Sequence, residues 1–123
     1  MKFEFRNGLL YLPLSICYDG LVELIGIIDT GSAGTAVDVS RFNIDLLSRN
    51  GRSITLHGVG GTQDAFVQTV TRVTVGGFEA NDFEIEFCDL KDSFGFEAII
   101  GGDLLMALGA VIDYTACDIS FKK

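Results

Sequence analysis

The sequence predicts a mostly β protein, and three observations lead to this fold class. Its 123 residues suffice for one buried core but not for two, so we expect a single domain over residues 1–123. Apolar residues make up 48% of the chain, which is typical of a folded domain. Fifteen glycines stand against one proline, and short apolar segments alternate with glycine-containing turns. We therefore expect strands throughout, with one or two short helices.

The N-terminal third is expected to form strands joined by tight turns. In residues 2–6, two phenylalanines alternate with charged residues, which indicates a short half-buried strand. Asn7-Gly8 predicts a turn, and residues 9–18 a second strand. Asp19-Gly20 is a hairpin signal, after which residues 21–28 form an apolar strand.

The middle of the chain combines a short helix with a long hairpin. Ser40 can cap a helix over residues 41–47. Residues 53–57 and 65–75 flank the glycine-rich stretch 58–61, so we expect two strands joined at a glycine-rich tip.

The C-terminal third repeats the alternation of strands and turns. In chain order we expect a turn at 76–77, a strand at 83–87, a looser segment at 89–96, an apolar strand at 98–100, a helix at 104–108 ended by Gly109, and strands at 111–113 and 118–121.

The composition argues against several classes of function. A net charge of −8, with no basic cluster except Lys122-Lys123, disfavours nucleic acids and anionic membranes as partners. No apolar run approaches the roughly 18 residues of a membrane span, and residues 1–4 do not begin a signal peptide.

The three cysteines indicate a reducing compartment. Cys17, Cys88 and Cys117 are odd in number and have no scaffold spacing, so we expect them to be small buried apolar residues in a cytoplasmic protein. They do not form a metal-ligand set with the single histidine, so we expect no metal and no cofactor.

One motif carries the chemistry. Ile27-Ile28 ends an apolar strand, and Asp29 follows directly, before Thr30-Gly31 turn the backbone. A lone carboxylate does little, but two carboxylates about 3 Å apart cannot both ionise and therefore share one proton. One can then act as general base on a water and the other as general acid toward a carbonyl. The motif occurs once, so we expect the second carboxylate to come from a second copy of the chain.

Three signals together resemble the retropepsin-like family of aspartic proteases. Asp29-Thr30-Gly31 is similar to the family signature, Ile99-Ile100-Gly101 to the apolar pair plus glycine of its second half, and the tip at 58–61 to its flap. They follow in the family's order. The resemblance implies a closed-barrel-like acid protease fold with one lobe per chain, a homodimer, and a polypeptide substrate bound in extended form.

The resemblance also assigns roles to residues. Asp29 would activate the water, Thr30 would hydrogen-bond across the dimer axis, and Gly31 would let the two carboxylates lie coplanar. Ser32, which is similar to the serine of the pepsin-like branch, could donate to Asp29 and contact substrate. The expected flap residues are Gly58, Val59, Gly60 and Gly61.

Two features of the sequence depart from the pattern or compete with it. Ala33 and Gly102 stand where many retroviral members carry an acidic residue and an arginine that form an ion pair. Asp113 also follows an apolar pair, but Tyr114-Thr115 replaces the Thr-Gly turn, so we consider it a weak second candidate.

Two other functions remain open at this point. The chain could be a non-catalytic peptide-binding or dimerisation module with the same fold. Alternatively, it could be a small β-barrel that binds a ligand, with Asp29 as an ordinary turn residue.

Overall fold

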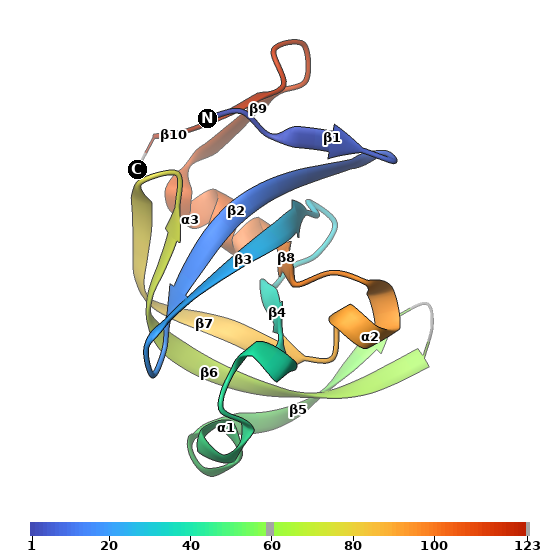
Figure 1. The fold of residues 1–123 in the computed structure, drawn as a ribbon, viewed down its shortest axis with the longest axis vertical. Coiled ribbons are helices and arrows are strands. Elements are labelled where there is room, and N and C mark those ends of the chain that lie inside the picture. Colours follow the sequence, from blue (N-terminus) through green and yellow to red (C-terminus); the bar gives the residue numbers. More distant parts are fainter. Residues whose placement is uncertain (59–60, 123) are drawn as a thin grey trace.

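The fold is mostly β, as the sequence predicts. The computed structural model describes residues 1–58 and 61–122 (Figure 1). Strands take up 56% of the described residues, and helices, with a 3₁₀ turn included, 18%. The strands are β1 (Glu4–Arg6), β2 (Leu9–Cys17), β3 (Leu21–Ile28), β4 (Ala36–Asp38), β5 (Arg52–Gly58), β6 (Gly61–Val75), β7 (Phe78–Cys88), β8 (Ala98–Ile100), β9 (Ala110–Asp113) and β10 (Asp118–Phe121).

Eight of these strands form one strongly curved sheet. Their order is β1-β2-β3-β8-β4-β7-β6-β5, and β2 also pairs with β6 through residues 15–17. The sheet therefore folds back on itself and is partly closed (Figure 1). Most neighbours are antiparallel, but β3 pairs with β8 and β4 with β7 in parallel. The expectation of a closed-barrel-like sheet is met at this coarse level.

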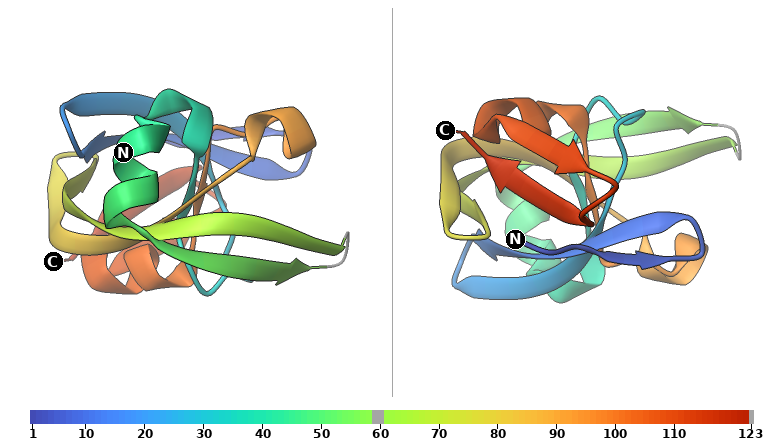
Figure 2. Two further views of the ribbon diagram at one scale, coloured as in Figure 1. Left: turned by 90° about the horizontal axis from the view of Figure 1, so that it is seen from below. Right: turned by 90° about the horizontal axis from the view of Figure 1, so that it is seen from above.

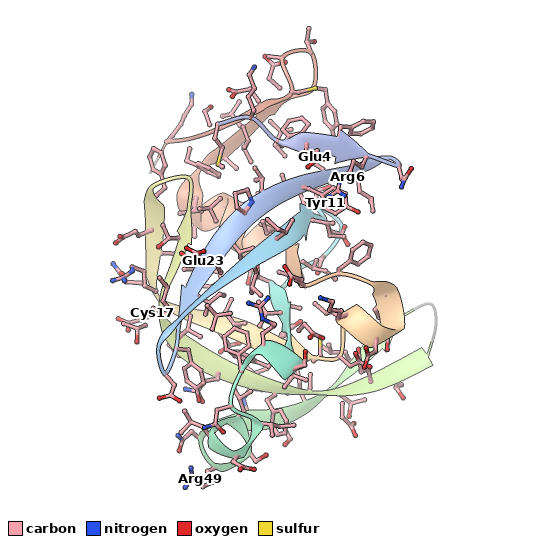
Figure 3. All side chains as sticks on the ribbon, viewed as in Figure 1. Glu4, Arg6, Tyr11, Cys17, Glu23 and Arg49 are labelled. Carbon is pink, nitrogen blue, oxygen red and sulfur yellow. The ribbon has the colours of Figure 1, made fainter. Side chains whose placement is uncertain are left out.

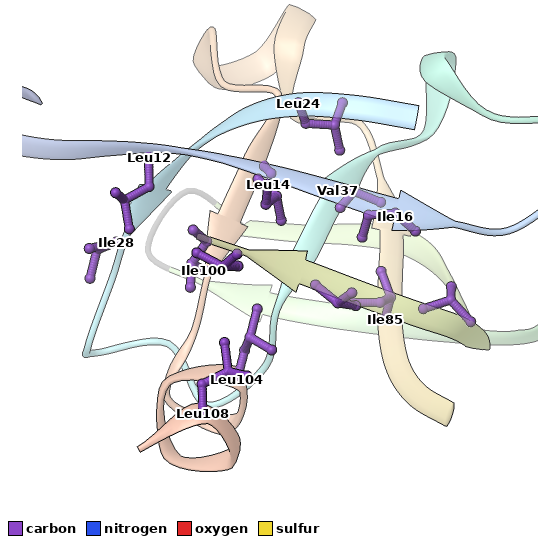
Figure 4. Packing of buried hydrophobic residues seen from close by; sticks show 14 of the residues in the cluster. Leu12, Leu14, Ile16, Leu24, Ile28, Val37, Ile85, Ile100, Leu104 and Leu108 are labelled. Carbon is purple, nitrogen blue, oxygen red and sulfur yellow. The ribbon is translucent and has the colours of Figure 1, made fainter. Parts of the chain in front are cut away.

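The core lies inside this curved sheet because apolar residues alternate along the strands. In β2, every second residue from Leu10 to Ile16 is buried. Ile85 of β7 and Leu104 and Leu108 of the third helix close the core from the other side (Figure 4). On the outer face of β1 and β2, the Arg6 guanidinium stacks on the Tyr11 ring at 4.0 Å (Figure 3).

The helices differ from the sequence prediction. There are three of them among the residues described, α1 (Ile44–Asn50), α2 (Lys91–Phe94) and α3 (Gly102–Leu108), besides a 3₁₀ turn at Val39–Arg41. The helix predicted at 41–47 is wrong in its start, since Asn43 accepts from the Leu46 N–H and caps α1. Helix α2 falls in the segment that we expected to be irregular. No helix in the described part of the chain is long and apolar enough to cross a membrane.

Ser40 is not a helix cap because its hydroxyl donates to Asp38 instead. Asp38 is buried and also accepts from the backbone N–H groups of Leu90 and Lys91, each at 3.0 Å. Burial alone would raise the pKa of Asp38, but these hydrogen bonds outweigh it and lower the pKa. Asp38 thus ties β4 to the start of α2.

Two further expectations about burial are wrong in part. Phe3 is buried, but Phe5 is mostly exposed, so the first strand does not bury both phenylalanines. The cysteines are all free, as expected, but only Cys88 is buried, while Cys17 is half-buried and Cys117 exposed. Burial raises the pKa of the Cys88 thiol to about 12, so this thiol stays protonated.

The chain ends pair with each other within one molecule. Strands β9 and β10 form a separate antiparallel hairpin, as the sequence predicts for 111–113 and 118–121. Residues 1–3 run along the other side of β10, where the terminal amine of Met1 donates to the Ile119 carbonyl at 2.7 Å and Phe3 N–H donates to the Cys117 carbonyl at 3.1 Å. Strand β10 therefore lies between the N-terminal residues and β9 (Figure 2).

Candidate active site

The loop that carries Asp29 leaves the sheet at the end of β3. Strand β3 runs parallel to β8, with Ile28 opposite Ile100. The Asp29 N–H donates to the Ile100 carbonyl at 3.0 Å, so the start of the loop is fixed by the neighbouring strand. Buried apolar residues lead up to this point, and Asp29, Thr30 and Gly31 are then exposed.

The Asp29 carboxylate is held within its own turn. Its Oδ1 accepts from the Gly31 N–H at 3.0 Å, and its carbonyl accepts from the Ser32 N–H at 3.1 Å. Short turn residues allow this compact loop. The carboxylate therefore has a defined position and an exposed face, and it does not lie in a closed cavity of the single chain.

The second half of the chain binds the Asp29 loop through backbone hydrogen bonds. Gly102 N–H donates to the Ser32 carbonyl at 2.7 Å, and Asp103 N–H donates to the Ala33 carbonyl at 3.3 Å. A Cβ added to Gly101 would collide with the Gly34 carbonyl group and lie 2.6 Å from its carbon. The backbone of the Asp29 loop therefore packs closely against Gly101, where only a residue without a side chain fits.

A buried hydrogen-bond network supports the same contact. Thr35 is fully buried; its hydroxyl donates to Asp103 Oδ1 at 2.7 Å and accepts from the Gly101 N–H at 3.1 Å. The Thr35 N–H donates to Asp103 Oδ2 at 3.3 Å. These two side chains join the Asp29 loop to the start of α3. The sequence analysis assigns no role to Thr35 or to Asp103. Thr35 lies four residues after Gly31 and Asp103 directly follows Gly101-Gly102, and neither position by itself signals the contact.

A second carboxylate lies against the loop. Glu86, on β7, is half-buried, and a Cβ added to Gly34 would be 2.7 Å from its Oε1. Burial raises the pKa of Glu86, and the negative charges of Asp103 and Glu84 raise it further. The carboxylate of Glu86 thus occupies the space that a side chain at position 34 would need.

The structure corrects one expected contact and places the departures from the family pattern. The Ser32 hydroxyl donates to the Gly34 carbonyl at 2.8 Å, so in this structure it does not donate to Asp29. Ala33 and Gly102, where the expected ion pair is missing, are joined to the opposite half by the backbone bonds described above. Asp113 caps the turn between β9 and β10, where its Oδ1 accepts from the Thr115 and Ala116 N–H groups.

The hairpin of β5 and β6 forms the remaining part of the predicted site. Gly58 and Gly61 face each other at its end, while Val59 and Gly60 lie outside the described residues. A hollow of about 480 Å³ runs along the hairpin, lined by Ser53, Ile54, Thr55, Asp64, Ala65 and Phe66. A second hollow of about 390 Å³ lies over β2 and β3. Neither hollow is lined by Asp29.

The hairpin is fixed to the rest of the protein near its middle. Ile54 and Leu56 pack against a small apolar cluster that includes Leu90. The Gln63 amide donates to the Asp89 carbonyl at 2.6 Å. Within residues 1–58 and 61–122, no group of three or more histidine, cysteine, aspartate or glutamate side chains could hold a metal ion.

Comparison with known proteins gives no further assignment. The chain matches no protein-family model, and no curated protein matches it. The functional argument therefore depends on the geometry: an exposed carboxylate on a loop that hydrogen bonds from the second half of the chain hold in place.

Proposed function

We propose that the chain is one half of an aspartic endopeptidase of the retropepsin-like kind, which becomes active as a homodimer. The observation that carries the proposal is the exposed Asp29 carboxylate on a loop fixed by Ile100, Gly101 and Thr35. A catalytic carboxylate must be accessible and accurately held at once. This loop meets both conditions, whereas an ordinary turn aspartate requires no support from a distant part of the chain.

The two halves of the sheet support the acid-protease fold. The two sequence segments that resemble each other, Ile27-Ile28 and Ile99-Ile100, are neighbours in register in parallel strands. Each is followed by a loop or helix that contacts the other. We infer that the partly closed sheet is one lobe of that fold, and that the hairpin of β5 and β6 is its flap.

In the proposed reaction, one of the two Asp29 side chains removes a proton from water. The water oxygen bonds to the peptide carbonyl carbon, while the protonated Asp29 gives its proton to the carbonyl oxygen. The resulting diol collapses, the carbon–nitrogen bond breaks and the amine nitrogen takes up a proton. Thr30 and Gly31 hold the pair in place, and the substrate lies extended under the hairpin.

The proposal extends to the cofactor requirement and the cellular compartment. Peptide hydrolysis by a carboxylate pair needs no cofactor. The free cysteines fit a reducing compartment, so we place the enzyme in the cytoplasm.

The decisive experiment is peptide hydrolysis by the purified chain and by Asp29→Asn. We expect the nearly isosteric variant to fold normally and to lose activity by about 10³-fold or more, because it removes the shared proton and charge. The matched control is Asp113→Asn, which changes the same group in the β9–β10 turn and should stay active. Retention of a tenth of the wild-type turnover by Asp29→Asn would place the chemistry elsewhere.

The second candidate function is a non-catalytic peptide-binding or dimerisation module. It is favoured by the long hairpin and the hollow along it, which can accept an extended peptide without any reaction. A chain that binds library peptides but cleaves none of them, with or without Asp29, would support this candidate.

A further inference from the structure

The hollow over β2 and β3 is separate from the Asp29 loop. This outer hollow measures about 390 Å³ and extends from β3 across β2 to the turn between β6 and β7, which contains Gly76. Its volume lies within the range of small-molecule sites, roughly 300–1,000 Å³. Asp29 does not line it, so what the outer hollow binds is independent of the proposed peptidase.

Two rows of side chains form the floor of the outer hollow. Alternate residues of β2, β3 and β6 fill the core, so the residues between them point outward. The strand register places Glu23 opposite Ser15 and Ser15 opposite Thr74, which makes a polar row across β3, β2 and β6. Ile25 lies opposite Pro13, and these two make an apolar row beside the polar one, two residues along the strands or roughly 7 Å away.

Apolar side chains give the outer hollow an exposed apolar wall. Ile25 is 47% exposed although it is a large apolar residue. Met1 lies over the turn between β6 and β7, since a Cβ added to Gly76 would meet the Met1 sulfur. Both side chains line the outer hollow together with Pro13. A wall of this kind favours a ligand with an apolar part over a fully polar one.

The outer hollow also carries negative charge that is not compensated. Two carboxylates line it, and Glu97 is already bound by Arg41 at 2.7 Å. Glu23 is exposed (Figure 3), and among the described residues its carboxylate is in no ion pair. No described lysine or arginine lines the hollow, and Arg72, on the same face of β6, pairs with Glu79 at 3.9 Å. A cation would therefore meet an unpaired carboxylate here, in a chain whose net charge is −8.

The backbone around the outer hollow is already bonded or lacks a donor. The Ile25 N–H donates to Glu97 Oε1 at 2.9 Å, and the Glu23 carbonyl accepts from Arg41 at 3.2 Å. On its other side, β2 pairs with β1 through residues 9–11 and with β6 through residues 15–17. Between these two stretches stands Pro13, which has no N–H. Strand pairing, which would hold an extended peptide, is therefore closed, and this favours a small ligand.

We propose that the outer hollow binds a small apolar primary amine. Its ammonium group donates to the Glu23 carboxylate and to the hydroxyl oxygens of Ser15 and Thr74, while its apolar part lies on Pro13 and Ile25. An ammonium group has three N–H donors, and each residue of the polar row has a side-chain oxygen that accepts. The separation of the two rows, roughly 7 Å, is close to the length of a phenyl group joined to an amine by two carbons.

Titration with 2-phenylethylamine, followed by two-dimensional NMR of the backbone amides, tests this site. We expect shifts at Ser15, Glu23 and Thr74 and a Kd of about 1 mM, the affinity expected of a ligand with about nine non-hydrogen atoms. Glu23→Gln should weaken the binding about fivefold, because it removes the charge and keeps the shape. The matched control is Glu4→Gln, which removes the same charge from β1, outside the hollow, and should leave the Kd as it is in the wild type.

The uncharged analogue 2-phenylethanol separates the charge from the apolar contact. It should bind more weakly than the amine, and Glu23→Gln should not change its Kd. Equal affinities of the two ligands, equal effects of Glu23→Gln and Glu4→Gln, or no shifts in the hollow at about 10 mM amine would overturn the proposal. Asp29→Asn should bind the amine like the wild type, so a loss of peptidase activity and a loss of amine binding are separate results.

Discussion

Two similar segments, Ile27-Ile28-Asp29 and Ile99-Ile100-Gly101, end neighbouring strands, but the first ends in an exposed carboxylate and the second in a buried glycine. Ile27-Ile28 and Ile99-Ile100 are paired in register between β3 and β8, and both pairs pack toward the core. After the first pair comes Asp29, whose side chain is exposed. After the second comes Gly101, which is buried and carries no side chain because the Gly34 backbone occupies that space.

Under the proposed function, this difference would let a single short chain build half of a site. The first segment exposes the Asp29 carboxylate. The second has Gly101 at the matching position, and the missing side chain lets the backbone of the Asp29 loop pack against it. The backbone bonds from Gly102 and Asp103 and the Thr35 hydroxyl complete the contact. Four variants test how far the exposed Asp29 depends on this support.

The largest effect is expected at Gly101. In Gly101→Ala, the new Cβ meets backbone atoms of Gly34, which cannot rotate away, so either the loop or β8 must shift. We expect the free energy of unfolding to fall by about 3 kcal/mol, measured by urea denaturation. The matched control is Gly102→Ala, whose Cβ would be 3.5 Å from the Ser32 carbonyl oxygen, an ordinary contact.

The control variant should even gain stability. Gly102 is the first residue of α3, and replacing glycine by alanine in a compatible conformation contributes about 0.4–1 kcal/mol. Equal effects of the two substitutions would mean that the close packing of the loop over Gly101 is not required.

The sequence predicts the strand and turn that carry Asp29 better than the contacts that support them. The apolar strands, the Asp29 turn and the glycine after the second apolar pair are all visible as patterns of apolar residues and glycine. Thr35 and Asp103 are 68 residues apart, and nothing in their local sequence shows that they meet. Similarly, Ser40 has the chemistry of a helix cap, but a buried neighbour, Asp38, takes its hydroxyl.

The next effect is expected at Thr35. Thr35→Val keeps the shape but removes the donor to Asp103 and leaves the buried Gly101 N–H without an acceptor. We expect a loss of about 2 kcal/mol in the free energy of unfolding. Thr69→Val, an exposed position on β6, is the control and should change stability by no more than about 0.5 kcal/mol. Matching losses in both variants would show that the buried network contributes nothing.

A pH-dependent effect is expected at Glu86. Burial and the charges of Asp103 and Glu84 raise its pKa above the usual 4.5 in the folded state, so the native protein binds more protons than the unfolded chain just above pH 4.5. The stability of the wild type should therefore fall as the pH rises from 4.5 through the folded pKa, and Glu86→Gln should remove this decrease. Denaturation at a series of pH values measures it.

The control for this measurement is Glu79→Gln, an exposed carboxylate on the same strand. It should leave the pH dependence of the unfolding free energy as it is in the wild type. If Glu86→Gln also leaves it unchanged, the carboxylate beside Gly34 is better hydrated than its position indicates.

The smallest effect is expected at Ser32, where sequence and structure give different answers. A serine that donates to Asp29 would favour the ionised pair, and Ser32→Ala would then move the basic limb of the pH–activity profile upward. In the structure the hydroxyl donates to the Gly34 carbonyl instead. We therefore expect Ser32→Ala to lower the free energy of unfolding by about 1 kcal/mol or less and to leave both limbs in place. The readout is the pH profile of peptide hydrolysis beside a denaturation curve, and an upward shift of the basic limb at unchanged stability would mean that the hydroxyl turns to Asp29 when the second copy binds.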